Sequence, residues 1–424
     1  MKRKFIKYFF YTSLILLLLL IINFSACPFI IKQIYDEALL GKDYIEGSIY
    51  FAKEQKFNQA VITAAAAQNN FSAAVQNFAQ LKKRYFIFRH WPCKTQFENG
   101  ENLINASFIL SGIIEKGVEL GFNFENILEG NRKMSFSKFS INEKKKILKF
   151  AGDASLALEK IENDLSMTAD KINNLKYAGF LKPYGAQIND LKIKIEESRI
   201  ILTKASPMLK VFPSLFGYPE KINYLVMLQN SDELRPTGGF LGTFSLLTME
   251  NGEIAECATH DIYHLDMPVQ NILNIAPPEP LKKYLGVNKW YMRDANWSPD
   301  WNISADKIEW FYKNESRLLS KKNKASEISS DVNFDAVAAI TPKLITDLLA
   351  ITGPVKVEGK EYNKDNFVEL LQYRVEKEYR NLGIRSWDRK EVISEIYKKI
   401  KIKLFDLPFS RWREVVEVFD KNID

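Results

Sequence analysis

Cysteine and histidine are scarce in this sequence, with three of each among 424 residues. Cys27, Cys93 and Cys257 lie far apart and form no CxxC pair, so neither zinc ligation nor a disulfide framework is indicated. His260 and His264 lie four residues apart on an expected strand, without the helical HExxH context of a zinc protease. Because GxSxG, P-loop and GxGxxG motifs are also missing, ordinary hydrolase and nucleotide-binding functions have no support.

A long run of one charge sign is lacking as well. The 59 Lys and Arg residues are interspersed with 52 Asp and Glu residues, and the net charge is +7. Without a basic block, the chain has no pattern typical of nucleic-acid binding, although one anionic partner at one site is compatible with this charge. Hydrophobic residues at 46% and charged residues at 26% are typical of a folded globular protein.

The N-terminus contains the one long hydrophobic run. Basic residues within positions 2–7 precede an uncharged stretch from Tyr8 to Ile31. This stretch has roughly 24 residues, against the roughly 20 that a membrane-spanning helix needs. We therefore predict a single-pass membrane anchor over residues 1–34, with a cytoplasmic N-terminus and the rest of the chain outside the membrane. A cleaved signal peptide is the alternative, but its apolar core is usually only about 7–15 residues long.

Residues 35–206 have the pattern of a helical domain. Two apolar stripes alternate spacings of three and four residues, as in coiled coils. Gly179, Pro183 and Gly185 separate the stripes and indicate a chain reversal. We predict an antiparallel helical hairpin, with a dimeric coiled coil as the alternative. The stripes are Ile147, Ala151, Ala154, Leu158, Ile161, Leu165, Thr168, Ile172 and Leu175, and then Ile188, Leu191, Ile195, Ser198, Leu202, Ala205 and Leu209.

A proline-rich linker after position 206 marks the start of a C-terminal domain, residues 207–424. "INYLVMLQ" predicts a buried strand, "FLGTFSLLTMENGEIAECATHD" a hairpin that turns at Asn251-Gly252, and "FDAVAAI" a further strand. A helix with Thr341 as N-cap follows, and later helices are expected over 365–379 and 388–401. The predicted fold class is α+β multidomain: a transmembrane helix, an all-α coiled-coil hairpin and a layered α/β domain.

Arginine, aspartate and tryptophan gather at three places in this domain. "SDELRPTGG" contains Asp232 and Arg235, and "RDANWSPDW" contains Arg293, Asp294, Trp297 and Trp301. "QYRVEKEYRNLGIRSWDR" contributes Arg374, Arg385 and Arg389. Arginines suit a pyrophosphate, an aspartate can hold Mg²⁺, and aromatic faces can pack a sugar or an isoprenoid. The alternative is that the arginines and aspartates form salt bridges and that the tryptophans belong to the core.

These motifs, with "FDAVAAITPKLITDLLAITGPVKV" and "WDRKEVISEIYKKI", closely resemble the bacterial family called domain of unknown function 4012, over about Phe212 to Ile400. That label assigns no function. The order of the motifs is also similar, more distantly, to the LytR-CpsA-Psr proteins. Those membrane-anchored enzymes transfer a glycopolymer from a polyprenyl-pyrophosphate carrier to the cell wall.

The distant resemblance implies a glycopolymer phosphotransferase of the cell envelope, acting on a cell-wall polymer. Arg235, Arg293, Arg385 and Arg389, with Arg374 beside them, would bind the pyrophosphate. Asp232 or Asp294 would hold Mg²⁺ or orient the attacking hydroxyl, and Trp297 and Trp301 would stack on the ligand. The chain departs from the pattern, because "GGFLGT" stands where those enzymes carry Arg-x-Asp-Thr, and its C-terminus suggests a fragment. A non-catalytic assembly or scaffold protein that acts through its helical domain is the competing hypothesis.

Overall fold

The computed structural model describes residues 28–84, 94–131, 133–176, 179–322 and 328–422. It contains two compact units, unit 1 with residues 1–130 and 149–212 and unit 2 with residues 131–148 and 213–424. The predicted membrane-spanning stretch lies outside the described residues as far as Cys27. Within the described ranges, no helix combines the length and the apolar character that a membrane crossing requires.

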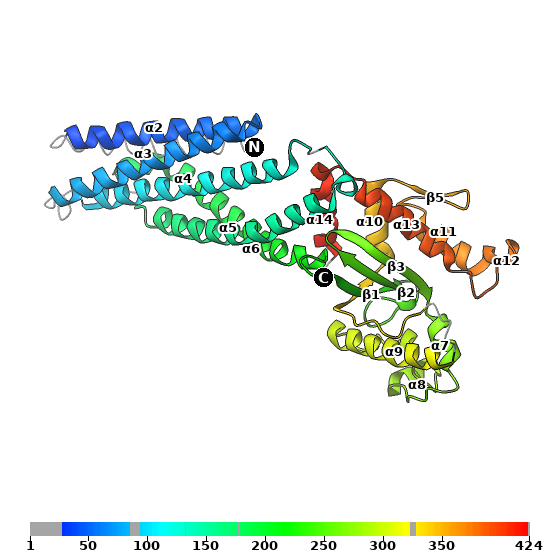
Figure 1. Ribbon diagram of the computed structural model, residues 1–424. Coiled ribbons are helices and arrows are strands. Elements are labelled where there is room, and N and C mark those ends of the chain that lie inside the picture. Colours follow the sequence, from blue (N-terminus) through cyan, green and yellow to red (C-terminus); the bar gives the residue numbers. More distant parts are fainter. Residues whose placement is uncertain (1–27, 85–93, 132, 177–178, 323–327, 423–424) are drawn as a thin grey trace. The chain divides into compact units, whose positions relative to one another are not determined.

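The predicted fold class is wrong. Most described residues are helical, and the strands form only one four-stranded sheet and one two-stranded hairpin (Figure 1). Nor does a transmembrane helix occur among the described helices. In the sheet, only β1 (Ile222–Asn230) and β4 (Ala336–Ile340) pair in parallel. The alternation of strands and helices in residues 207–424 therefore produces a single parallel strand pair and not a layered α/β domain.

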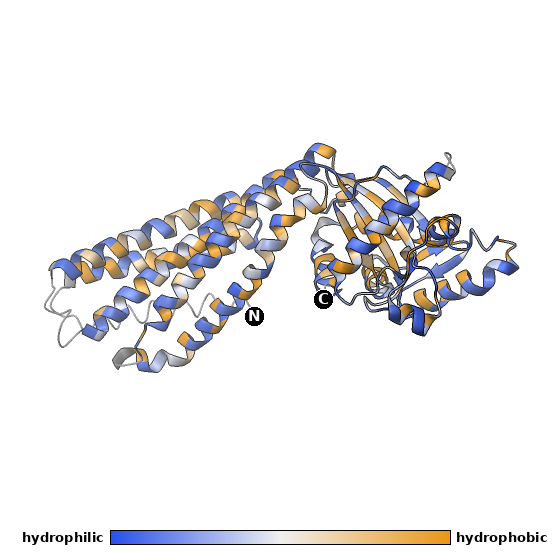
Figure 2. Cartoon of the chain, turned by 90° about the horizontal axis from the view of Figure 1, so that it is seen from below, coloured by the Kyte–Doolittle hydropathy of each residue, from blue (hydrophilic) through white to orange (hydrophobic). Residues whose placement is uncertain are grey.

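Unit 1 consists of long helices. Small residues bring α2 and α3 close together: Ala60, Ala64 and Ala67 are fully buried, and the Ser48 hydroxyl donates a hydrogen bond to the Ala60 carbonyl at 2.8 Å. Alternating hydrophobic and hydrophilic residues colour these helices in Figure 2, as expected for helices that bury one face. The helices are α2 (Pro28–Lys53), α3 (Phe57–Arg84), α4 (Lys94–Leu128), α5 (Ile141–Asn173), the 3-10 turn η3 (Gly179–Tyr184) and α6 (Gly185–Leu215).

The heptad stripes lie on α5 and α6. On α5 all of their members are buried except Leu158, which packs against the same core at partial exposure. On α6, Ile188, Leu191 and Ile195 join this core, whereas the later members of the stripe are partly exposed. Two polar contacts fix α6 against α5: Ser206 donates to the Ser155 carbonyl at 3.0 Å, and Thr203 donates to Glu162 Oε1 at 2.7 Å.

The two units do not coincide with the predicted domain boundaries, which were placed after residue 34 and between residues 206 and 207. Residues 131–148 belong to unit 2, where the Phe136 ring lies 5.4 Å from the Trp412 ring and Lys144 forms an ion pair with Glu253. In addition, α6 continues through Pro207 as far as Leu215. A proline in the first half of the predicted linker therefore does not end the helix.

Unit 2 contains the sheet, with strand order β3-β2-β1-β4. The predicted strands and the Asn251-Gly252 turn are confirmed, with β2 at Phe240–Glu250 and β3 at Glu253–Asp261. The hairpin is β5 (Val355–Val357) with β6 (Lys360–Tyr362). The helices are η2 (Phe136–Lys138), α7 (Tyr263–Val269), α8 (Glu279–Leu285), η4 (Met292–Asp294), α9 (Trp301–Lys322), α10 (Pro342–Thr352), α11 (Phe367–Tyr373), the π-helical η5 (Arg374–Glu378), α12 (Tyr379–Asn381), α13 (Glu391–Phe405), η6 (Phe409–Arg411) and α14 (Trp412–Asn422).

Two hydrophobic clusters hold unit 2 together. In the first, Leu225 and Phe244 of the sheet pack with Phe311 and Tyr312 of α9. In the second, α10, α11 and α13 pack around the β5-β6 hairpin. The strands accordingly appear mainly hydrophobic in Figure 2. The candidate site lies at the end of the sheet where β1 passes into β2, beside the first cluster.

Candidate functional site

The loop from Ser231 to Gly239 connects β1 to β2 in a tight path. Gly238 has a positive φ of 115°, which disfavours side chains, and a Cβ on Gly239 would lie 2.5 Å from the Asn230 carbonyl oxygen. The Asn296 amide donates to Thr237 Oγ1 and to the Gly239 carbonyl, both at 2.8 Å. The loop therefore holds the segment around residue 296 against the sheet, and its two glycines make this close approach sterically feasible.

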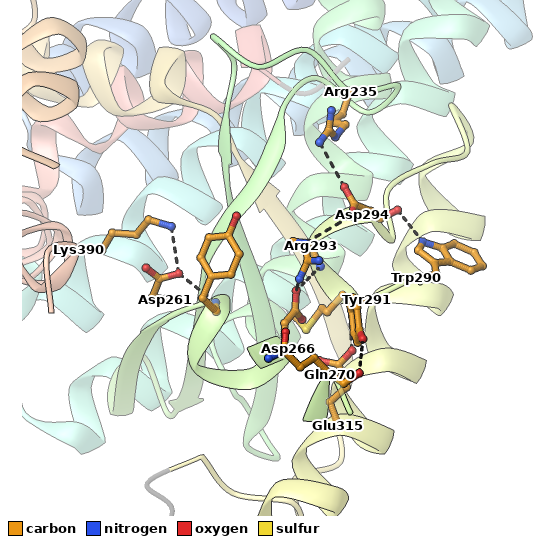
Figure 3. A network of polar contacts seen from close by, with 12 residues as sticks. Arg235, Asp261, Asp266, Gln270, Trp290, Tyr291, Arg293, Asp294, Glu315 and Lys390 are labelled. Atoms are coloured by element: carbon orange, nitrogen blue, oxygen red, sulfur yellow. Dashed lines mark hydrogen bonds and ion pairs between the residues drawn. The ribbon is translucent and has the colours of Figure 1, made fainter. Parts of the chain in front are cut away.

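Arg235 is paired within the chain. Its Nη2 donates to Glu233 Oε1 at 2.9 Å and to Asp294 Oδ1 at 3.2 Å, and its guanidinium lies 5.3 Å from the centre of the Phe240 ring. The Arg235 side chain is only 11% exposed. The guanidinium thus connects the loop to η4 and points toward Asp294, as Figure 3 shows.

Arg293 is paired in the same network. Its Nη1 donates to Asp266 Oδ2 at 2.9 Å, and its Nε lies 3.6 Å from Asp294 Oδ2. The guanidinium also faces the rings of Tyr291 and Tyr263, with 4.8 and 5.6 Å to their centres. The structure therefore brings the predicted residues Arg235, Arg293 and Asp294 together. They form a series of ion pairs that connects the β1-β2 loop, η4 and α7 (Figure 3).

Beneath Arg293 lie two buried carboxyl groups that the sequence analysis missed. Asp266 of α7 and Glu315 of α9 are both fully buried, and the Met292 backbone N–H donates to Glu315 Oε1 at 3.2 Å. Burial raises the pKa of Asp266 to about 6, and burial together with the neighbouring Asp266 raises the pKa of Glu315 well above its usual value. The pair therefore holds a proton at a pH where exposed carboxyls have lost theirs.

Asp232 and Asp294, predicted as metal ligands or catalytic groups, do not fit a Mg²⁺ site. Asp294 faces two guanidinium groups, and burial raises its pKa in spite of them. Asp232 is exposed on the loop. Magnesium prefers an octahedral set of oxygens without competing cations. Across the described ranges, no group of three or more His, Cys, Asp and Glu side chains is placed to hold a metal ion.

The predicted arginines of the C-terminal helices form a separate group. Arg374, at the start of the π-helical turn η5, donates from Nε and Nη2 to the two oxygens of Glu358 at 2.7 and 3.0 Å. Arg389 donates to Glu376 at 3.4 Å, and Arg385 donates to Asp388 at 2.5 Å while 80% exposed. Each of these arginines already has a carboxylate partner.

Arg374 and Arg385 line one cavity of about 280 Å³. Arg374 is 2% exposed, and its Nη1 is buried without a hydrogen-bond partner. The lining also contains Glu358, Asp388 and Glu391, so it presents more carboxylates than guanidinium groups. Such a mixed lining offers both donors and acceptors to a polar ligand.

The two tryptophans predicted to stack on a ligand differ in their surroundings. Trp301 packs against the core cluster of α9, and Trp297 is half-buried. Trp290, in the same segment, donates from Nε1 to the Asp294 carbonyl at 2.8 Å and packs edge-on against Phe311. Much of this aromatic surface therefore belongs to the fold of unit 2.

Lys390 and Asp261 form a further pair that sequence reasoning missed. Lys390 Nζ donates to Asp261 Oδ1 at 3.0 Å and to the Gly242 carbonyl at 2.7 Å. Burial lowers the pKa of Lys390, opposed by Asp261. The sequence did contain a signal for the burial of Glu315, because this residue shares its helical face with Ile308, Phe311 and Leu319. Lys390, which follows Arg389, has no comparable apolar pattern around it.

Comparison with known proteins gives one match. No curated protein and no solved structure matches the chain. Residues 220–375 match the family described as "Protein of unknown function (DUF4012)". This region includes the β1-β2 loop, η4 and Arg374, whereas Arg385 and Arg389 lie beyond it. The match supports the resemblance to this family over residues 220–375, whereas the more distant similarity to the LytR-CpsA-Psr proteins has no such support.

Proposed function

We propose that this chain is a non-catalytic assembly protein of the cell envelope that contacts a partner through its helical unit. One observation carries the proposal: α6 has a second apolar face, opposite its buried one. Ile193, Ile200, Ile201, Met208 and Val211 are exposed by 37 to 65%. Exposed apolar residues that recur on one helix face are typical of contact surfaces.

The charged network of unit 2 favours this function over catalysis. Arg235, Arg293 and Asp294 neutralise one another and are mostly shielded from solvent. A pyrophosphate would have to displace their carboxylate partners, which leaves buried acids without a counter-charge. Their arrangement suits a role in fixing the loop, α7 and η4. A location outside the cell membrane is a further part of the proposal, and it depends on the sequence of residues 1–34 and on the family resemblance.

Site-specific photo-crosslinking in the living cell tests this function. A photoreactive amino acid at Ile201 should give a discrete crosslinked product that Ile200→Asp suppresses, because the charge disrupts the apolar contact. The matched control is the same photoreactive group at Asp153, an exposed position on α5. Equal crosslinking from both positions, or none from Ile201, would rule out this face as a contact surface.

Binding of a polyprenyl-pyrophosphate-linked glycan, with transfer as in the LytR-CpsA-Psr proteins, is the second candidate. The cavity with Arg374 and Arg385 favours it, because the buried Nη1 of Arg374 lacks a partner and an anionic oxygen would supply one. A short polyprenyl pyrophosphate at a hundredfold excess over its Kd should then stabilise the protein by about 2.7 kcal/mol. Arg385→Ala should reduce this stabilisation, and Arg413→Ala, which removes an arginine that is 84% exposed on α14, should not.

A further inference from the structure

The exposed face of α6 is symmetric in its chemistry. On an ideal helix, Ile193, Ile200, Ile201 and Met208 fall within an arc of about 100°. Glu197 and Lys204 lie in the middle of the same arc, and both are exposed. These six residues are related in pairs around the midpoint between Ile200 and Ile201, whereas Val211 would correspond to Asp190 and lies outside this symmetric segment. Ile193 corresponds to Met208, and Glu197 corresponds to Lys204.

We propose that this face binds a second copy of the chain, with the two α6 helices antiparallel about a two-fold axis between Ile200 and Ile201. The inference rests on the proposed function and names its partner. In this arrangement Ile200 of one copy meets Ile201 of the other, and Ile193 meets Met208. A two-fold interface is isologous, so each contact occurs twice.

Charge complementarity favours the antiparallel arrangement. The side chains of Glu197 and Lys204 have no hydrogen bond or ion pair with the rest of the described chain. In the antiparallel pair, each Glu197 lies opposite Lys204 of the other copy. A parallel pair would instead place Glu197 opposite Glu197 and Lys204 opposite Lys204, which repel. The two charges therefore specify the direction of the helices as well as their register.

The interface is confined to one face, because the opposite side of α6 is already occupied. Ile188, Leu191 and Ile195 pack into the core of unit 1, and Ser206 and Thr203 are hydrogen-bonded to α5. Pairing of two copies therefore requires no rearrangement of the helical unit. It removes from water a set of isoleucine side chains that are otherwise more than half exposed.

Sedimentation velocity of the full chain, in a nonionic detergent and at low ionic strength, tests this inference. The wild type should show a concentration-dependent dimer. Glu197→Lys and Lys204→Glu should each raise the dimer Kd by about tenfold, because two attractive pairs become repulsive. The double variant Glu197→Lys/Lys204→Glu should regain the wild-type Kd, and Asp153→Lys on α5 should leave it unchanged.

Three outcomes would overturn the inference. A monomer at every concentration excludes self-association, a dimer that none of the variants weakens uses another surface, and a double variant weaker than both single variants excludes the antiparallel register. The proposed function fails separately, through the crosslinking experiment at Ile201. Crosslinking to a different protein together with a monomeric chain would keep the assembly function and reject the second copy as partner.

Discussion

Asp266 and Glu315 form a fully buried carboxyl pair, and one oxygen of each, Asp266 Oδ1 and Glu315 Oε2, has no hydrogen-bond partner, so a proton shared between the two carboxyls would satisfy both. Without the shared proton, two negative charges would lie side by side in the core, with Arg293 as their nearby cation. The pair positions Arg293, and Arg293 in turn contacts Asp294 of the loop network. Protonation in the core of unit 2 is therefore coupled to the arrangement of the β1-β2 loop and η4.

This pair predicts a pH dependence of stability. Its pKa values are raised on folding, so between about pH 4 and 6 the folded state holds a proton that the unfolded state has released. The contribution of Asp266 is complete below its unfolded pKa and is lost as pH rises through about 6, and the contribution of Glu315, whose pKa is raised well above its usual value, is lost as pH rises through that raised pKa. Glu315→Gln should flatten this loss, by up to about 1.4 kcal/mol per pH unit, because glutamine donates to Asp266 at every pH.

Urea unfolding of both proteins from pH 4.5 to 7.5 measures the difference in slope. Asp306→Asn, an exposed change on the same helix, is the control and should follow the wild type. Parallel curves for wild type and Glu315→Gln would mean that the buried pair carries no proton in this range.

Asp294→Asn should destabilise the protein, by on the order of 3 kcal/mol, because it leaves two largely buried guanidinium groups without their common carboxylate. Thermal unfolding checks this. Asp365→Asn removes a carboxylate that is 73% exposed and should change the free energy of unfolding by less than about 1 kcal/mol. If both variants were equally stable, the ion-pair network would not contribute to the fold.

Gly239→Ala should cost on the order of 2 kcal/mol or more, because the added Cβ would meet the Asn230 carbonyl oxygen at 2.5 Å, an atom of the backbone that cannot move freely. Gly47→Ala is the matched control. The added Cβ meets nothing within 4 Å inside α2, so this change should stabilise by about 0.5–1 kcal/mol. Denaturant midpoints of the two variants should therefore shift in opposite directions, and a shared direction would contradict this account of the loop.

The local elements of unit 2 were predictable, and its polar partnerships were not. Apolar runs and the Asn251-Gly252 turn predicted β1, β2 and β3, because strand and turn preferences act over a few residues. The pairing of Arg293 with Asp266, 27 positions earlier, depends on how α7 and η4 pack, which no local pattern encodes. The arginine motifs stay a prediction of a binding site, because a sequence does not reveal whether an arginine faces a ligand or its own carboxylate.

The fold class failed for a related reason. Strands and helices do alternate after residue 220, but a parallel sheet requires the strands themselves to pair in parallel. Here β2 pairs antiparallel with β1 after the loop at residues 231–239, and β3 pairs antiparallel with β2 after the Asn251-Gly252 turn. On α6 the heptad stripe, buried in its first half, was predicted, whereas the exposed isoleucines of the opposite face had no place in that pattern. They emerge only when the burial of both helix faces is compared.

Lys390→Met should destabilise unit 2 by about 2–3 kcal/mol, because it leaves the buried Asp261 carboxylate without its cation and the Gly242 carbonyl without its donor. Methionine retains most of the apolar stem, so the lost ammonium group accounts for the effect. Lys398→Met, at an exposed position on α13, is the matched control and should stay within about 0.5 kcal/mol of the wild type. Hydrogen exchange of the β2 and β3 amides should rise only in the first variant. Unchanged exchange would show that Lys390 does not connect α13 to the sheet.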